Sequence, residues 1–187
     1  MGVRWTELLG TAVVAVALSA CGGDGGDGGE DPGEQNNPGE PSQRTESGIS
    51  EACSLFPGPS TQVNLTANAA GAPLINSSTS YHVITAEGAA GWSGYFSFTS
   101  GGGDVVFSVD TTAVTLDIPQ GQAKPPTPTF IITSNGGAVS ASEAVAAPLE
   151  CTSVVGAYRY ELAAGTYQVL VNPTAWYQFR LVASEVD

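Results

Sequence analysis

The chain has 187 residues, 24 of them glycine, and carries a formal net charge of −13 at pH 7. So acidic a chain is not expected to bind nucleic acid by neutralising phosphates. Its length allows one domain with a proper hydrophobic core and additional segments outside it.

The first 20 residues have the layout of a signal peptide. Residues 1–7 are short and polar, residues 8–18 are apolar and uncharged, and Ser19 and Ala20 are small. The apolar run is too short to span a bilayer comfortably, which takes about 20 residues. We therefore predict a signal peptide over residues 1–20.

The stretch Leu18-Ser19-Ala20-Cys21 resembles the lipobox of bacterial lipoproteins. The resemblance implies cleavage before Cys21, a diacylglyceryl thioether on its sulfur and an acylated new N-terminus. The membrane is then a partner through Cys21, held firmly because each buried CH₂ adds about 0.8 kcal/mol. Gly22 and not Asp follows Cys21, which favours a lipid-anchored place in the cell envelope, at the outer membrane or cell surface. A plain signal peptide with a chance cysteine is the alternative.

Residues 21–50 are rich in Gly, Pro and acidic residues, with no apolar side chain between Cys21 and Ile49. This segment cannot bury enough apolar surface to become ordered, so we predict a disordered linker. Its Gly/Asp spacing is also typical of calcium-binding β-rolls, but the nonapeptide does not recur and a spacer is favoured. Repulsion from anionic headgroups would keep the following domain off the membrane.

Two further cysteines, Cys53 and Cys151, form an even pair in a chain predicted to be exported. A disulfide is the expected state, worth up to about 4–5 kcal/mol for so long a loop. Two free buried thiols are the alternative. A zinc site is disfavoured, because the chain has no CxxC pair and His82 is its only histidine.

Residues 51–187 show no sustained helical period. Short alternating runs separated by Gly, Pro, Asn and Ser predict an all-β domain of about eight strands, a sandwich or a barrel. Strands are expected over residues 63–65, 81–84, 94–99, 105–109, 114–118, 130–133, 158–162, 166–171 and 176–182. The last three are expected to form an antiparallel meander. Residues 119–128 read as a proline-rich loop, and residues 140–147 as a helical turn or a loop.

Leu162 to Val171, followed by Tyr177 to Leu181, looks like the ending of bacterial pre-peptidase C-terminal domains. Residues 95–109 look like the central hairpin of that family and residues 114–118 like its next strand. The resemblance spans residues 92–182 and implies a jelly-roll-like antiparallel β-sandwich, an accessory module without a catalytic role. Some members bind calcium or matrix polymers, but Gly91-Trp92-Ser93-Gly94 stands where members often carry Asp, so calcium binding is not carried over.

No set of residues in the sequence predicts catalysis. His82 is expected on a strand surface, and Asp104, Asp110 and Asp117 are expected as solvent-facing residues near strand ends. We therefore predict no enzyme, no catalytic or metal-binding residues and no cofactor. A hydrolase hidden in the loops is the disfavoured third reading.

Three aromatic residues, Trp92, Trp176 and Tyr177, are expected at strand edges or turns. Such rings can stack against sugars, or they can plug the ends of a sandwich, and plugging is the favoured role. The favoured function is a non-catalytic, membrane-anchored lipoprotein that presents a β-sandwich interaction module, with envelope proteins or polysaccharide as partners. The alternative is a carbohydrate- or matrix-binding module that uses these three side chains.

Overall fold

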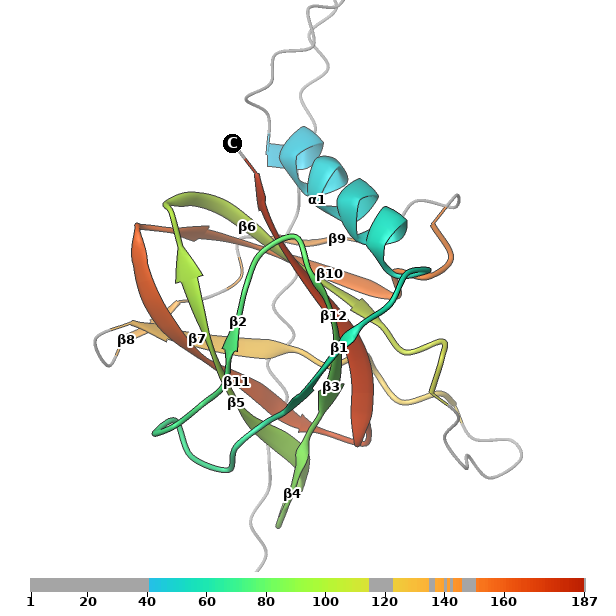
Figure 1. The fold of residues 1–187 in the computed structure, drawn as a ribbon, viewed down its shortest axis with the longest axis vertical. Helices are drawn as coiled ribbons and strands as arrows, with labels where there is room; N and C mark the ends of the chain where they lie inside the picture. The colour runs from blue at the N-terminus through green and yellow to red at the C-terminus, as the bar shows by residue number, and fades with distance from the viewer. Residues whose placement is uncertain are drawn as a thin grey trace, which may run out of the picture. The chain divides into compact units, whose positions relative to one another are not determined.

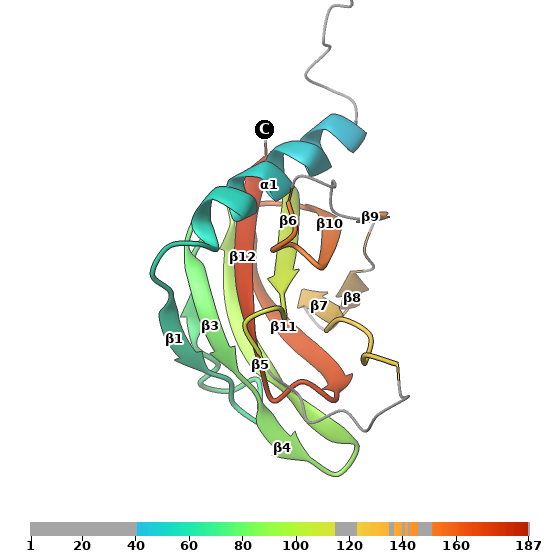
Figure 2. The ribbon, with the colours of Figure 1, turned by 90° about the vertical axis from the view of Figure 1, so that its right-hand side faces the viewer.

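The computed structural model describes residues 41–114, 123–134, 137–139, 141, 143–145 and 151–186. Within them two β-sheets face one another, and one helix packs against the outer side of the first sheet (Figures 1 and 2). The predicted all-β sandwich is thus confirmed, with the addition of a helix. Cys21, the signal peptide and residues 22–40 lie outside the described residues.

Sheet A contains six strands in the order β1-β3-β12-β6-β10-β9. The strands are β1 (Thr61–Asn64), β3 (Ser80–Ile84), β12 (Gln178–Val186), β6 (Gly103–Asp110), β10 (Gly156–Leu162) and β9 (Glu143–Val145). Neighbours pair antiparallel except β1 and β3, which run parallel. β9 lies inside residues 140–147, for which a helical turn or loop was expected.

Sheet B follows the order β2-β5-β11-β7-β8, with β4 also paired to β5. The strands are β2 (Leu74–Ile75), β4 (Ala86–Gly88), β5 (Gly91–Ser100), β7 (Phe130–Ser134), β8 (Gly137–Val139) and β11 (Gly165–Thr174). The described residues thus form twelve strands, more than the eight or so expected. Four of them have only two or three residues, too few to show an alternating pattern in the sequence.

Consecutive strands cross between the sheets at two tight turns. β5 of sheet B leads through Gly101 and Gly102 into β6 of sheet A, and β10 of sheet A leads through Ala163 and Ala164 into β11 of sheet B. Gly102 has a φ of 102°, a left-handed value open to glycine but rarely to other residues. A Cβ there would lie 3.3 Å from the backbone nitrogen of Ala164, so the two turns lie side by side.

These crossings overturn two expectations. Residues 95–109 do not form a hairpin, because β5 and β6 belong to different sheets, and residues 158–182 do not form a meander, because β10, β11 and β12 alternate between sheets A and B. An alternating pattern fixes which side of a strand is buried, but it does not specify which sheet the strand joins. A strand was also expected over residues 114–118. Its first residue, Val114, instead ends a turn, in which the Val114 N–H donates to the Thr111 carbonyl. Residues 115–118 lie outside the described residues.

The main hydrophobic core lies between the two sheets. Its centre is a group of aromatic rings in which Phe107 of β6 contacts Phe96, Phe98, Phe130 and Tyr160 with ring centroids 5.4–6.0 Å apart. Three of these contacts have the edge-to-face geometry that aromatic pairs prefer. The core is continuous from β1 to β12, and every long strand contributes its apolar side to it.

Helix α1 (Pro41–Leu55) corrects the predicted linker, because residues 41–50 are helical and packed. Its buried face consists of Thr45, Gly48, Ile49 and Ala52, and Phe56 follows directly. They lie three or four residues apart, the spacing of one helix face, and form a second core with Val106, Ala157 and Val182 on the outer side of sheet A. Small or hydroxylated residues at three of these five positions, Thr45, Gly48 and Ala52, hide the apolar period in the sequence.

The predicted disulfide is confirmed: Cys53 of α1 bonds to Cys151, which precedes β10, across a sequence separation of 98. The helix is fixed at two further points. The Ser184 hydroxyl donates to the Gly48 carbonyl (3.2 Å), and Arg44 pairs with Asp104 of β6 (2.9 Å). Segment 41–56 is therefore an integral part of the sandwich.

Candidate functional site

Trp176 does not form a stacking platform, because its side chain is buried with 1% of its surface exposed. Its indole N–H donates to the Pro126 carbonyl (3.0 Å), and the Lys124 ammonium lies 5.2 Å from the ring centroid. The ring thus holds the proline-rich segment against the sandwich. A sugar therefore cannot stack on Trp176, which has the plugging role favoured from the sequence and drops out of the candidate binding residues.

The other two predicted aromatics form a pair. Trp92 is half-buried, and its ring meets that of Tyr177 edge-on, with centroids 6.1 Å apart. Tyr177 is 37% exposed and its hydroxyl accepts a hydrogen bond from Gln178 (3.2 Å). The pair offers one exposed ring with a polar tip, a smaller surface than the three rings expected.

A groove of about 490 Å³ lies at the end of the sandwich where β4 turns into β5, and its lining includes neither Trp92 nor Tyr177. Three segments form its walls: residues 90–91, 125–129 and 172–175. The lining is uncharged, with proline rings at four positions and an amide at Asn172, which donates to the Thr129 hydroxyl (2.7 Å). Such a lining suits an uncharged ligand with both apolar and hydroxyl surface. The proline-rich loop of the sequence was the only signal that pointed to it.

The acidic residues Asp104 and Asp110 were expected in solvent, yet both are buried. Arg44 and Arg159 each donate to one carboxylate oxygen of Asp104, at 2.9 and 2.7 Å. Two cations thus compensate the buried carboxylate between α1 and the strands of sheet A. The arrangement is structural, because it fixes the first turn of α1.

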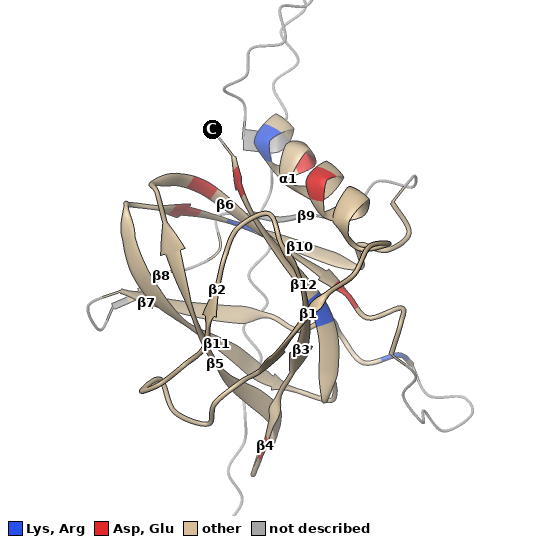
Figure 3. Ribbon diagram, in the orientation of Figure 1, with Lys and Arg blue, Asp and Glu red and all other residues tan. Residues whose placement is uncertain are grey.

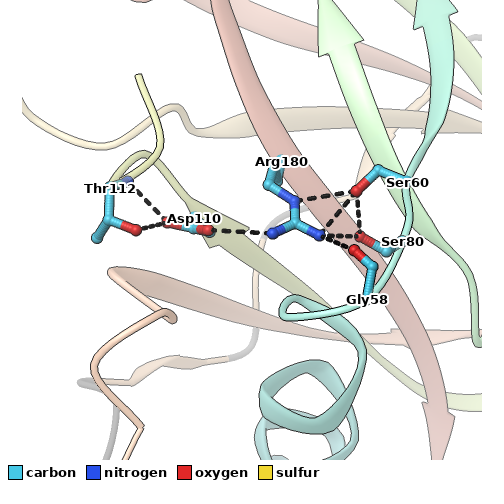
Figure 4. Close-up of polar contacts among 6 residues, drawn as sticks. All are labelled: Gly58, Ser60, Ser80, Asp110, Thr112 and Arg180. Atoms are coloured by element: carbon cyan, nitrogen blue, oxygen red, sulfur yellow. Dashed lines mark hydrogen bonds and ion pairs between the residues drawn. The ribbon is translucent and has the colours of Figure 1, made fainter. Parts of the chain in front are cut away.

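Asp110 belongs to a second polar cluster, drawn in Figure 4. Its carboxylate accepts hydrogen bonds from the backbone and the hydroxyl of Thr112 and lies 3.9 Å from the Arg180 guanidinium. Arg180 also donates to the Ser60 hydroxyl (2.7 Å) and the Gly58 carbonyl (3.0 Å). The guanidinium thus ties the segment that leaves α1 to the middle of sheet A.

His82 lies on β3, and its Nε2 is hydrogen-bonded to the side-chain amide of Gln178 on the adjacent strand β12 (3.1 Å). The partner in this contact is an amide and not a carboxylate. The part of the chain that the structure describes contains no group of three or more His, Cys, Asp or Glu side chains placed to hold a metal ion. No helix among the described residues is both long and apolar enough to cross a bilayer.

One tyrosine has a strongly shifted pKa. Burial, with a smaller contribution from the neighbouring Tyr158, raises the pKa of Tyr160 well above its usual value. The Tyr160 hydroxyl donates to the Phe130 carbonyl (3.2 Å) inside the core. Desolvation disfavours the phenolate, so this group remains neutral and belongs to the packing of the sandwich.

No family model matches the chain, and no curated protein is similar to it. The resemblances to bacterial lipoproteins and to pre-peptidase C-terminal domains therefore rest on the quoted residues alone.

Proposed function

We propose that this protein is a non-catalytic lipoprotein of the cell envelope, anchored by acyl chains on Cys21, that presents its β-sandwich as an interaction module. The observation that carries the anchor is the stretch Leu18-Ser19-Ala20-Cys21. The position and fixation of α1 describe how the sandwich would follow that anchor. The helix begins at Pro41, 20 residues after the proposed anchor, and is attached to sheet A by the Cys53–Cys151 disulfide and the Arg44–Asp104 ion pair.

The direction of α1 supports an outward-facing groove. The helix starts at one end of the sandwich, and the β4–β5 turn, which forms part of the groove, lies at the opposite end in both views (Figures 1 and 2). A tether attached at Pro41 leaves the groove, Trp92 and Tyr177 at the end far from the attachment point. An acidic tether also resists adsorption to an anionic membrane surface.

The anchor is tested by expressing the full chain in a bacterial host and separating membranes from the soluble fraction. We expect the protein in the membrane fraction, released by detergent, with its N-terminal peptide starting at Cys21 and carrying acyl mass. Cys21→Ser should move it to the soluble fraction, whereas the matched Cys53→Ser variant should stay on the membrane. An unmodified Cys21 in a soluble protein would rule the proposal out.

Carbohydrate or matrix binding is the second candidate function, favoured by the uncharged groove and by one exposed aromatic ring. The exposed ring is that of Tyr177, in contact with Trp92. A pull-down on insoluble polysaccharides should lose binding in Tyr177→Ala and keep it in the control Leu74→Ala, another exposed large side chain. Trp176 is unsuitable for such a test, since its removal would disturb the core. Equal retention of both variants would count against this function.

A further inference from the structure

Residues 123–129, which we call the strap, belong to no helix or strand and lead directly into β7. Residues 125–129 of the strap form one wall of the groove. Three of the four residues 125–128 are proline, which has no backbone N–H and cannot donate a hydrogen bond to a neighbouring strand. The strap is therefore held by individual contacts and not by a ladder of backbone hydrogen bonds.

The end of the strap next to β7 is firmly fixed to the sandwich. The Thr127 hydroxyl lies 3.0 Å from the hydroxyl of Tyr158 on β10. Asn172 of β11 donates its backbone N–H to the Thr129 carbonyl (3.0 Å) and its side-chain amide to the Thr129 hydroxyl (2.7 Å). Gly156 permits the close approach of Thr127, because a Cβ at Gly156 would lie 3.0 Å from Thr127 Oγ1.

The other end of the strap, residues 123–126, is held by a single side chain. The Pro126 carbonyl accepts the hydrogen bond from the Trp176 indole (3.0 Å), and the Lys124 ammonium lies 5.2 Å from the centroid of the same ring. Within the described part of the chain, residues 123–126 make no other hydrogen bond or ion pair. Lys124 and Pro126 are both exposed, so solvent reaches this end from outside.

Little charge surrounds the contact between Lys124 and Trp176. Strands β5 and β11, whose ends line the groove, contain no charged residue and are tan in Figure 3. Lys124 is the only charged residue of the strap, and no described carboxylate pairs with it. The negative face of an indole ring attracts a cation, so the ring is the group that holds this ammonium.

Trp176 also connects two walls of the groove. It directly follows residues 172–175, which form one wall, and its indole N–H reaches the strap, which forms another. Because the strap is fixed at Thr127 and Thr129, breaking the indole contact would let residues 123–126 move away from residues 172–175. The groove would then widen at this end, while the β-sandwich itself kept its pairing.

We propose that residues 123–126 are a gate of the groove, hinged at Thr127 and latched by Trp176, which opens without unfolding of the sandwich. Local opening of this kind occurs in segments with few backbone hydrogen bonds, and it needs less free energy than global unfolding. The purpose of the gate, admission of a neutral saccharide, rests on the second candidate function. The opening itself does not, so it is measured without a ligand.

The indole N–H of Trp176 is the probe, because it exchanges with solvent deuterium only when its bond to the Pro126 carbonyl is broken. Exchange is followed by NMR on the full chain with Cys21→Ser, Trp5→Phe and Trp92→Phe, which leaves one indole signal. We expect its protection to be at least about tenfold below that of the Val169 backbone N–H, which lies in the middle of β11. Equal protection would overturn the proposal, since the latch would then break only when the sheet unfolds.

Two variants weaken the gate in different ways. Lys124→Gln removes the cation from the ring and should speed exchange of the indole N–H about two- to fivefold, with exchange at Val169 unchanged. Pro126→Ala keeps the accepting carbonyl but frees the backbone, and should speed exchange by a similar factor. Lys124→Arg is the matched control, because it keeps a cation and should retain the parent rate. Unchanged exchange in both weakened variants, each shown to be folded by circular dichroism, would also overturn the proposal.

Saccharide titrations test what the gate admits. If only the open groove binds, the apparent Kd falls by the factor by which the open population rises. Lys124→Gln should therefore bind soluble chitin or cellulose oligosaccharides about two- to fivefold more tightly than the parent. Equal affinity of parent and variant, together with faster indole exchange in the variant, would overturn the admitting role. Absence of saccharide binding in both rejects the second candidate function instead, and the indole exchange still decides whether the gate opens.

Discussion

Replacement of Gly48 by alanine should destabilise the protein, although alanine is the better helix former. Gly48 lies in the middle of α1, where the helix meets β6. A Cβ added there would lie 2.7 Å from Cβ and 2.8 Å from Cγ2 of Val106, closer than such atoms approach in folded proteins. Val106 is fully buried in a central strand and its β-branched side chain has little rotamer freedom, so the helix must move away.

The magnitude follows from two opposing effects. Glycine to alanine in a helix interior gains about 1 kcal/mol of intrinsic propensity. Overpacking a buried contact costs about 1–3 kcal/mol, and lifting the helix also loosens Ile49 and Ala52 and the hydrogen bond from Ser184 to the Gly48 carbonyl. Taking the upper end of that range, we expect a net loss of about 2 kcal/mol in the free energy of unfolding.

Urea unfolding followed by circular dichroism measures this effect as a lower midpoint at unchanged slope. The matched control is Ser50→Ala, an exposed position of the same helix, which should be neutral or slightly stabilising. Val106→Ala removes two of the three close contacts, so it should partly rescue Gly48→Ala in a double-mutant cycle. A Gly48→Ala protein as stable as the parent would refute the close approach of α1 to β6.

Three further predictions concern stability. Cys53→Ser with Cys151→Ser, or reduction of the intact protein, should lower the free energy of unfolding by about 4–5 kcal/mol, measured by urea titration with and without reductant; an unchanged midpoint would contradict the bond. Arg180→Met should cost about 3 kcal/mol, because it leaves the buried carboxylate of Asp110 without its cation, and a thermal midpoint equal to that of the parent would show that the pair contributes nothing. The raised pKa of Tyr160 means that above pH about 10 the unfolded chain loses this proton while the folded chain keeps it. Stability should therefore fall with rising pH by up to about 1.4 kcal/mol per unit, and Tyr160→Phe should make that decline shallower; an identical decline in the variant would argue against burial of the hydroxyl.

The candidate site was only partly predictable. Trp92, Trp176 and Tyr177 were identified by residue type and by their position near turns, and the structure does place Trp92 against Tyr177. The sequence left Trp176 between a plugging role, which was favoured, and a binding role, because its burial depends on Pro126, 50 residues away along the chain, whose carbonyl accepts a hydrogen bond from the indole N–H. The groove was equally hidden, since its walls come from three segments that only the folded chain brings together.

Local pattern by itself determined most of the strands and the pairing of Cys53 with Cys151. Alternation along β5, β6 and β11 marks the side of each strand that is buried, because that property depends on neighbours two residues apart. With one cysteine assigned to the lipobox, the remaining two had only each other as partners.

Tertiary structure alone decided where those elements go. Residues 41–50 look like a linker because Gly48 and Thr45 interrupt the apolar period, and they become a buried helix face only against Val106 and its neighbours. Asp104 is buried because two arginines, one 60 and one 55 residues away, meet it there. The sheet to which each strand belongs arises from pairings between distant segments, and the local spacing of residues does not encode such pairings.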